Sequence, residues 1–277
     1  MNACAPCARA ADGLPMRARL ALRAAVAALP VVLSGCVQPV TPEARKLVAD
    51  ARAAYDRGDD PAVVRDTTTF LDRYAQTDLA DVAYYLRGLA HYRRKDLSAA
   101  RADLKLAASR AERRDVRVGA LKALGDLAFD AGDLEWAETL YREGLAAAAP
   151  RVPPADEIRY RLGCTLQRQG RWAQADEQFD RVVYVFADTE VARRAERRLR
   201  CLGWTVQAGA YARQDSARAE AFRLRKAGLA AATKSAMLDG KLRFLVHVGR
   251  YGRHDEAAGA LPAVRRLRSD AFVTPTR

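Results

Sequence analysis

Two stretches of this sequence place the same kinds of side chain in the same order. WTVQAGAYARQD, residues 204–215, and FLVHVGRYGRHD, residues 244–255, each carry an aromatic residue, a valine, a Gln or a His, a glycine, a tyrosine, an arginine and an aspartate. Amide, imidazole and phenol groups form hydrogen bonds, and a guanidinium group also binds carboxylates. These residue types could bind a polar ligand, and their repeated order indicates two related half-domains.

The residue types that a catalytic site needs are scarce in this chain. Its 277 residues include three His and five Cys, and no Ser or Cys nucleophile stands near a plausible base. Neither the Cys/His spacing of a metal site nor a phosphate-binding loop is found. We therefore expect a non-enzymatic protein that needs no cofactor and no metal ion.

Each repeated stretch predicts a β-strand followed by a helix. Apolar residues alternate with other residues, which is the period of a strand with one buried face. Those expected to face the core are Trp204, Val206 and Ala208 in the first stretch and Phe244, Val246 and Val248 in the second. After the tyrosine and arginine, Asp215-Ser216 and Asp255-Glu256 are expected to cap helices that begin there.

The segment between the two stretches completes a small α/β domain. Asp239-Gly240 is a two-residue hairpin signal that joins a strand at 231–238 to the strand at 243–248, and a last strand is expected at 271–274. The helices should be apolar at Ala219, Phe222 and Leu229 in the first and at Ala257, Leu261, Val264 and Leu267 in the second. The predicted order is β-α-β-β-α-β, a ferredoxin/RNP-like fold in which each half completes the sheet of the other.

Residues 201–277 resemble the SPOR domain, a small bacterial module that binds septal peptidoglycan at glycan strands stripped of their peptide stems. The resemblance rests on the motif aromatic-x-Val-Gln-x-Gly-x-aromatic, a helix, and a second copy, aromatic-x-Val-x-Val-Gly-x-aromatic, before a second helix. This sequence departs from the family at Leu245 and His247, where an Arg or another polar residue is common. The resemblance implies a glycan on the open face of the sheet.

The resemblance also implies which side chains contact the glycan. By position, Gln207 would bond to sugar hydroxyl or N-acetyl groups, with Tyr211 and Arg213 near the edge of the groove, and the second copy would contribute His247, Arg250 and Tyr251. Two alternatives stay open. The second copy completes the fold without touching a ligand, or Gln207 is an ordinary solvent-facing strand residue.

Residues 44–200 carry a different repeat, built on helices. Gly88, Gly125 and Gly163 set a register of 37 and 38 residues. A turn follows each glycine, then Ala at twelve residues and a large apolar residue at sixteen: Ala100 and Leu104, Ala137 and Tyr141, and Ala175 and Phe179. The pattern resembles the tetratricopeptide repeat, a pair of antiparallel helices that approach closely at Gly and Ala. The fold class is therefore α + α/β, with a helical solenoid that offers a surface to a protein partner.

The ends of the helical region show weaker forms of the same pattern. An earlier unit spans about 43–74, with Gly58-Asp59-Asp60 at its turn, and residues 189–200 are expected to form a closing helix. The amino-acid sequence of the repeats resembles the extended repeats of bacterial envelope proteins, although Ala75 and Ala187 stand where those proteins have Pro. The expected closing helix carries a run of arginines that is either a binding stripe or, as we expect, a solvated face: Arg193, Arg194, Arg197, Arg198 and Arg200.

The N-terminal residues predict export and lipidation. Arg17, Arg19 and Arg23 form a positive region before the apolar run at 24–33, which is too short to span a membrane. The following Leu-Ser-Gly-Cys resembles the lipobox of bacterial lipoproteins, so residues 1–35 would be a signal peptide, or residues 16–35 if translation starts at Met16. Cys36 would carry the lipid, and residues 36–43 would link it to the repeats.

These features leave three classes of function. The first is a lipid-anchored envelope adaptor, facing the periplasm on the outer membrane, that binds peptidoglycan and a protein partner. The second is a scaffold for envelope protein assembly whose C-terminal domain binds no glycan. The third is RNA binding. RNA-binding modules share this element order, and residues 201–277 carry +8 of the total charge of +13. The export signal argues against that class, as does the lack of the paired aromatic residues that such a module places on its central strands, and we expect no nucleic-acid partner.

Overall fold

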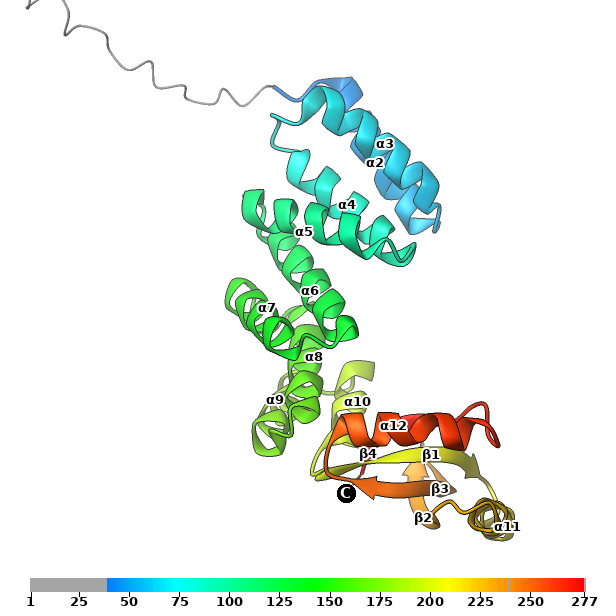
Figure 1. The fold of residues 1–277 in the computed structure, drawn as a ribbon. Coiled ribbons are helices and arrows are strands. Elements are labelled where there is room, and N and C mark those ends of the chain that lie inside the picture. Colours follow the sequence, from blue (N-terminus) through cyan, green and yellow to red (C-terminus); the bar gives the residue numbers. More distant parts are fainter. Residues whose placement is uncertain (1–38, 239, 277) are drawn as a thin grey trace, which may run out of the picture. The chain divides into compact units, whose positions relative to one another are not determined.

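The computed structural model describes residues 39–238 and 240–276. The expected signal peptide and Cys36 lie outside these residues. No helix among the described residues combines the length and the hydropathy that a membrane span requires. The described chain consists of a helical region followed by a small domain with one sheet (Figure 1).

The first part of the described chain consists of consecutive helical hairpins, and each hairpin is made of a first helix and a second helix (Figure 1). The first helices are α2 (Pro42–Asp56), α4 (Ala80–Arg93), α6 (Arg114–Ala131) and α8 (Ala155–Arg168), and α10 (Glu190–Arg198) closes the row. The second helices are α3 (Asp60–Tyr74), α5 (Leu97–Arg110), α7 (Leu134–Ala147) and α9 (Trp172–Val185). The helical solenoid, its early unit and its closing helix are thus confirmed.

Left-handed residues and aspartate caps form the turns inside these hairpins. The backbone turns at positive φ at Gly58, Lys95, Gly132 and Gly170. In three hairpins the next residue is an aspartate whose carboxylate accepts a hydrogen bond from the backbone of the new helix: Asp59 from Ala62, Asp96 from Ala99 and Asp133 from Trp136. These bonds satisfy amide groups that a helix start leaves unpaired, so the turns fall where the sequence predicts them.

A glycine sets the distance between the two helices in each of the last three hairpins. A β-carbon added at Gly88, Gly125 or Gly163 would lie 2.8, 2.6 or 2.5 Å from the side chain of Leu104, Tyr141 or Phe179, respectively. Those three side chains are fully buried, as are Ala100, Ala137 and Ala175. The glycine register read from the sequence therefore marks the contact that closes each pair.

The C-terminal domain has the predicted β-α-β-β-α-β order. Its elements are β1 (Gly203–Tyr211), α11 (Gln214–Lys226), β2 (Ala231–Leu238), β3 (Lys241–Tyr251), α12 (His254–Arg265) and β4 (Phe272–Thr276). The sheet is antiparallel with the order β2-β3-β1-β4, so β1 of the first half pairs with β3 and β4 of the second. Leu238 pairs with Lys241, as the predicted hairpin requires, and Asp239 itself lies outside the described residues.

Both helices cover one face of this sheet. Val206, Ala208, Val246 and Val248 are buried in the same core as residues of α11 and α12, which confirms the strand alternation read from the sequence. The predicted apolar face of α11 was wrong in part. Ala217, Ala221 and Leu224 are the buried positions, whereas the side chain of Phe222 is 54% exposed and Ala219 faces solvent. Residues 217, 221 and 224 follow a helical stripe that the larger Phe222 obscures in the sequence.

The predicted helix caps of this domain were also wrong. Helix α11 begins at Gln214 and α12 at His254, so the cap residues are Arg213 and Arg253 and the two aspartates stand in the first turn. Both arginines keep the extended backbone of the preceding segment. Glu256 accepts the backbone N–H of Arg253, while the Asp255 carboxylate pairs with the Arg253 guanidinium. An ion pair and a backbone bond thus replace the expected aspartate cap.

We predict that Gly125→Ala destabilises the protein by about 1–3 kcal/mol, because the added methyl group collides with the Tyr141 ring in a packed core. The matched control is Gly259→Ala in α12, where a β-carbon meets nothing within 4 Å. That change should be neutral or stabilise by up to about 1 kcal/mol, because Ala is the better helix former. Urea unfolding of both variants measures the difference. Equal effects at the two glycines would contradict the close-approach role of Gly125.

Candidate functional site

The face of the sheet that the helices leave open carries a transverse row of side chains. Gln207 of β1 pairs with Phe272 of β4 on one side and with His247 of β3 on the other, and His247 pairs with Ala232 of β2. Residues directly opposite each other on neighbouring strands point to the same face. An amide, an aromatic ring and an imidazole therefore lie side by side across the sheet, and the Phe272 side chain is 48% exposed.

Positive charge lies beside this row. Lys234 of β2 pairs with Leu245 of β3, and Arg243 pairs with Ala236, all on the same open face. Lys234 is exposed and Arg243 half-buried, whereas Leu245 is only 7% exposed. The repeated motif did not point to Phe272, Lys234 or Arg243. For the two cations the signal was the Asp239-Gly240 hairpin, because its register fixes which residues of β2 stand opposite β3.

His247 is neutral on this face. Burial, together with the charge of Lys234, lowers the pKa of its imidazole to about 4. Its Nε2 atom is buried and has no hydrogen-bond partner within the described chain. A neutral imidazole offers one donor and one acceptor. His247 and the Gln207 amide can therefore bind hydroxyl and amide groups of a ligand without bringing a net charge.

The two tyrosines of the motif pack on the other side of the sheet. The Tyr211 ring lies against Gly209, where an added β-carbon would be 2.9 Å from it, and the Tyr251 ring lies against Gly249, which has a φ of +69°. Both rings belong to the edge of the helix-covered core. The shift in pairing register between Gln207 and Gly209 reverses the side that Tyr211 faces. The repeated Gly-x-Tyr thus builds the fold at the ends of β1 and β3.

The remaining predicted site residues lie near those strand ends. The Tyr211 hydroxyl accepts a hydrogen bond from Arg268 at 3.0 Å, and burial raises the pKa of this phenol. Arg213 is exposed where α11 begins, and Arg250 is exposed one residue before the end of β3. The structure therefore brings Gln207 and His247 together on the open face and places Tyr211, Tyr251, Arg213 and Arg250 at the rim of the domain.

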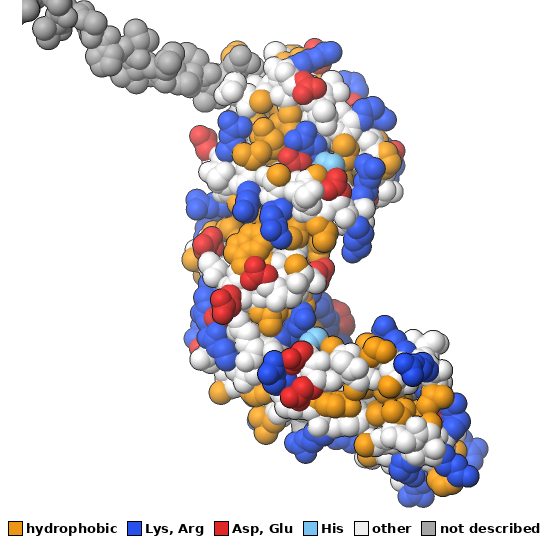
Figure 2. Space-filling view, viewed as in Figure 1, with side chains coloured by type: hydrophobic (Ala, Val, Ile, Leu, Met, Phe, Trp, Pro, Cys, Tyr) orange, Lys and Arg blue, Asp and Glu red, His pale blue; other side chains and the backbone are white. Residues whose placement is uncertain are grey.

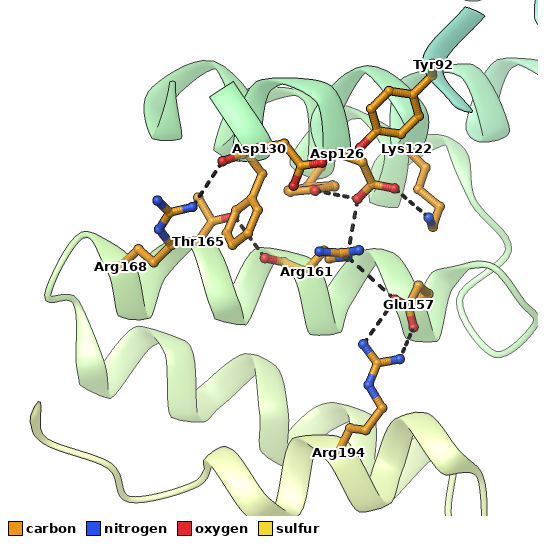
Figure 3. Close-up of polar contacts among 11 residues, drawn as sticks. Tyr92, Lys122, Asp126, Asp130, Glu157, Arg161, Thr165, Arg168 and Arg194 are labelled. Atoms are coloured by element: carbon orange, nitrogen blue, oxygen red, sulfur yellow. Dashed lines mark hydrogen bonds and ion pairs between the residues drawn. The ribbon is translucent and has the colours of Figure 1, made fainter. Parts of the chain in front are cut away.

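A chain of alternating charges crosses the row of first helices in the repeats (Figure 3). Asp126 of α6 accepts from Lys122 and from the Tyr141 hydroxyl, each at 2.7 Å, and lies 3.3 Å from Nε of Arg161. Arg161 lies 3.6 Å from Glu157 on the same helix, and Glu157 lies 3.1 Å from Arg194 of α10. We call this set the polar ladder. Its charges largely satisfy one another.

The ladder corrects in part the expectation that the arginine run at 193–200 is a solvated face: Arg193, Arg197 and Arg200 are exposed, but Arg194 and Arg198 are not. Arg194 joins the ladder, and Arg198 donates to the Tyr160 hydroxyl at 3.1 Å and to the Gln167 side chain at 3.0 Å. Two members of the run therefore fix α10 against α8. Lys and Arg side chains elsewhere are spread over the surface, as the face in Figure 2 shows.

The comparisons with known proteins agree with the C-terminal motif. Residues 203–275 match the family model of the SPOR domain. No curated protein matches the chain. The match runs from the start of β1 into β4, so the domain with the open sheet face matches the SPOR family over nearly its whole length.

Solved structures are similar to this chain at low identity, among them a tetratricopeptide repeat protein. One from Parabacteroides merdae is 18% identical with a TM-score of 0.49, and the match covers 57% of this chain and 59% of that one. The chain thus spans about three fifths of that relative. MamA is 17% identical with a TM-score of 0.45, and the match covers 52% of this chain and 78% of that one. YrrB, described as a TPR protein with an unusual peptide-binding site, is 15% identical with a TM-score of 0.43, over 56% and 84% of the two chains.

We predict that His247 makes the protein less stable as the pH falls from about 6.5 to about 4. The imidazole of the unfolded chain takes up a proton in this window, while the folded state, with its lowered pKa, does not. The loss should be roughly 2 kcal/mol, after a discount for the partial exposure of the ring. In His247→Gln this part of the pH dependence should vanish. Urea unfolding of both proteins at pH 7 and pH 4.5 measures it, and parallel curves would contradict a buried neutral His247.

Proposed function

We propose that this protein is a non-enzymatic, lipid-anchored adaptor of the bacterial cell envelope. Its SPOR domain, residues 201–277, binds glycan strands of peptidoglycan, chiefly the peptide-denuded strands of the septum. Its helical repeats, residues 44–200, bind a protein partner. The observation that carries the proposal is the row of Phe272, Gln207 and His247 on the open sheet face of a domain that matches the SPOR family.

The chemistry of this row suits a sugar chain. The hydroxyl and N-acetyl groups of a glycan can bond to the Gln207 amide and to the neutral imidazole of His247. The apolar face of a sugar ring can pack on the exposed ring of Phe272. Muramic acid carries a carboxylate, and Lys234 and Arg243 supply positive charge on the same face.

The residues at the rim complete the proposed site. Tyr211, Arg213, Arg250 and Tyr251 lie near the ends of β1 and β3, and we place them at the edge of the bound glycan. Their effect on binding should be smaller than that of Gln207, because the two tyrosine rings also pack against glycines at the edge of the core. The second copy of the motif then contributes to the ligand through His247.

The proposed anchor supplements a modest affinity. A single small sheet face binds its ligand on the order of micromolar Kd. A lipid on Cys36, with residues 36–43 as a linker, would hold the domain near the wall and raise its effective concentration there. The lipobox after a short apolar run supports this anchor, and we place it on the periplasmic side of the outer membrane.

We predict that the full chain cosediments with isolated sacculi and that amidase treatment, which removes peptide stems, increases the bound fraction. Gln207→Ala should weaken this binding about tenfold, the effect of losing a well-formed hydrogen-bonding side chain. Tyr211→Phe, which keeps the ring over Gly209, tests the rim hydroxyl. Gln214→Ala is the matched control, because Gln214 is exposed at the start of α11.

Two results would argue against the glycan role. Equal loss of binding in Gln207→Ala and Gln214→Ala would exclude the open sheet face as the site. No binding to treated or untreated sacculi would remove glycan recognition altogether, and the protein would then act as a scaffold through its helical repeats.

A further inference from the structure

A groove with three arginines lies between the second helices α7 and α9. Helix α8 forms its floor, and the cavity has a volume of about 410 Å³. Arg142 and Leu145 come from α7, Arg159 and Leu162 from α8, and Glu177 and Arg181 from α9. Leu162 is buried and Leu145 half-buried, so the groove combines apolar side chains with three guanidinium groups. We call this feature the α7–α9 groove.

The positive charge in this groove is only partly compensated. Arg159 forms no ion pair with a carboxylate among the described residues and donates instead to the neutral side chain of Gln178 at 3.1 Å. Burial and the charge of Arg181 both lower the pKa of the Arg159 guanidinium. A half-buried cation beside a second cation is a site that an incoming carboxylate stabilises.

The carboxylate that Arg181 holds is easily exchanged. Arg181 pairs with Glu177, and both side chains are 57% exposed. An exposed pair of this kind contributes at most about 1 kcal/mol. Arg142 is held more firmly, because its partner Glu138 is only 15% exposed and also pairs with Arg171. On the first helices, in contrast, the polar ladder joins partly buried charges of both signs.

An exposed aromatic residue extends the groove along α9. Tyr184 and Val185 follow Arg181 by three and four residues, which places them on the same side of the helix. The Tyr184 side chain is 87% exposed, the highest value among the large hydrophobic residues described as exposed. Exposed aromatic residues beside an arginine are typical anchors of protein interfaces.

We propose that the α7–α9 groove binds an acidic segment of a protein partner. A carboxylate of that segment lies between Arg159 and Arg181, and its apolar side chains pack on Leu145 and Tyr184. Three guanidinium groups against the single lining carboxylate of Glu177 favour an acidic peptide. The inference specifies the partner of the helical repeats in the function proposed above, and it does not depend on glycan binding.

The test measures fluorescence anisotropy of a short labelled peptide in which Glu alternates with Leu and Ser, mixed with the full chain. A peptide with Gln at every Glu position is the ligand control. We expect the acidic peptide to bind at least about tenfold more tightly than its Gln form. Arg159→Gln should weaken its binding about tenfold, and Tyr184→Ala should weaken it as well. Glu177→Gln should strengthen binding about threefold, because it removes the competing carboxylate.

The matched control is Arg117→Gln, because Arg117 is an exposed arginine of α6 outside the groove. An equal loss in Arg117→Gln and Arg159→Gln would overturn the proposal, since the peptide would then respond only to the total charge. Equal binding of the acidic and Gln peptides would overturn it too. Cosedimentation of Arg159→Gln with sacculi should be unchanged, so a failure of glycan binding appears in that assay and not in this one.

Discussion

Close approach at a glycine is the constraint on which both parts of the described chain depend. In the repeats, Gly88, Gly125 and Gly163 leave the space that Leu104, Tyr141 and Phe179 occupy. In the C-terminal domain, Gly209 and Gly249 leave the space for the rings of Tyr211 and Tyr251. The two architectures differ, but in each a glycine, which has no β-carbon, lies opposite a large side chain and lets that side chain pack closely. Since protein interiors are close-packed, the position of such a glycine fixes the distance between elements.

The distribution of charge separates structural arginines from available ones. In the polar ladder, Arg161 and Arg194 connect α6, α8 and α10. Because these ion pairs join neighbouring first helices, the network fixes the register of successive repeats. The α7–α9 groove is lined by Arg159, which has no carboxylate ion-pair partner among the described residues, and by Arg181, whose pair with Glu177 is exposed. Both sets are arginines in amphipathic helices, and only their contacts tell them apart. Net charge alone therefore describes neither surface.

Much of the fold could be predicted because its signals occur at fixed spacings. The glycine register of the repeats and the two-residue hairpin at 239–240 each depend on residues close in sequence, and both were confirmed. The helix caps at Asp215 and Asp255 and the buried face of α11 were wrong, because the strand ends and the sheet decide where a helix begins and which side it buries. Only part of the candidate site could be predicted from the sequence. Gln207 and His247 stand in a repeated motif, whereas Phe272 joins them through the pairing of β1 with β4.

The strand order of the C-terminal domain also determines when its open sheet face forms during folding. Gly203 of β1 pairs with Thr276 of β4, and the row on the open face takes one residue from each of four strands. A helical hairpin of the repeats joins segments that are close along the chain, so it can form as soon as its own residues have been made. The open sheet face exists only after β4 has joined β1. The helical region can therefore be structured before the row of Phe272, Gln207 and His247 exists.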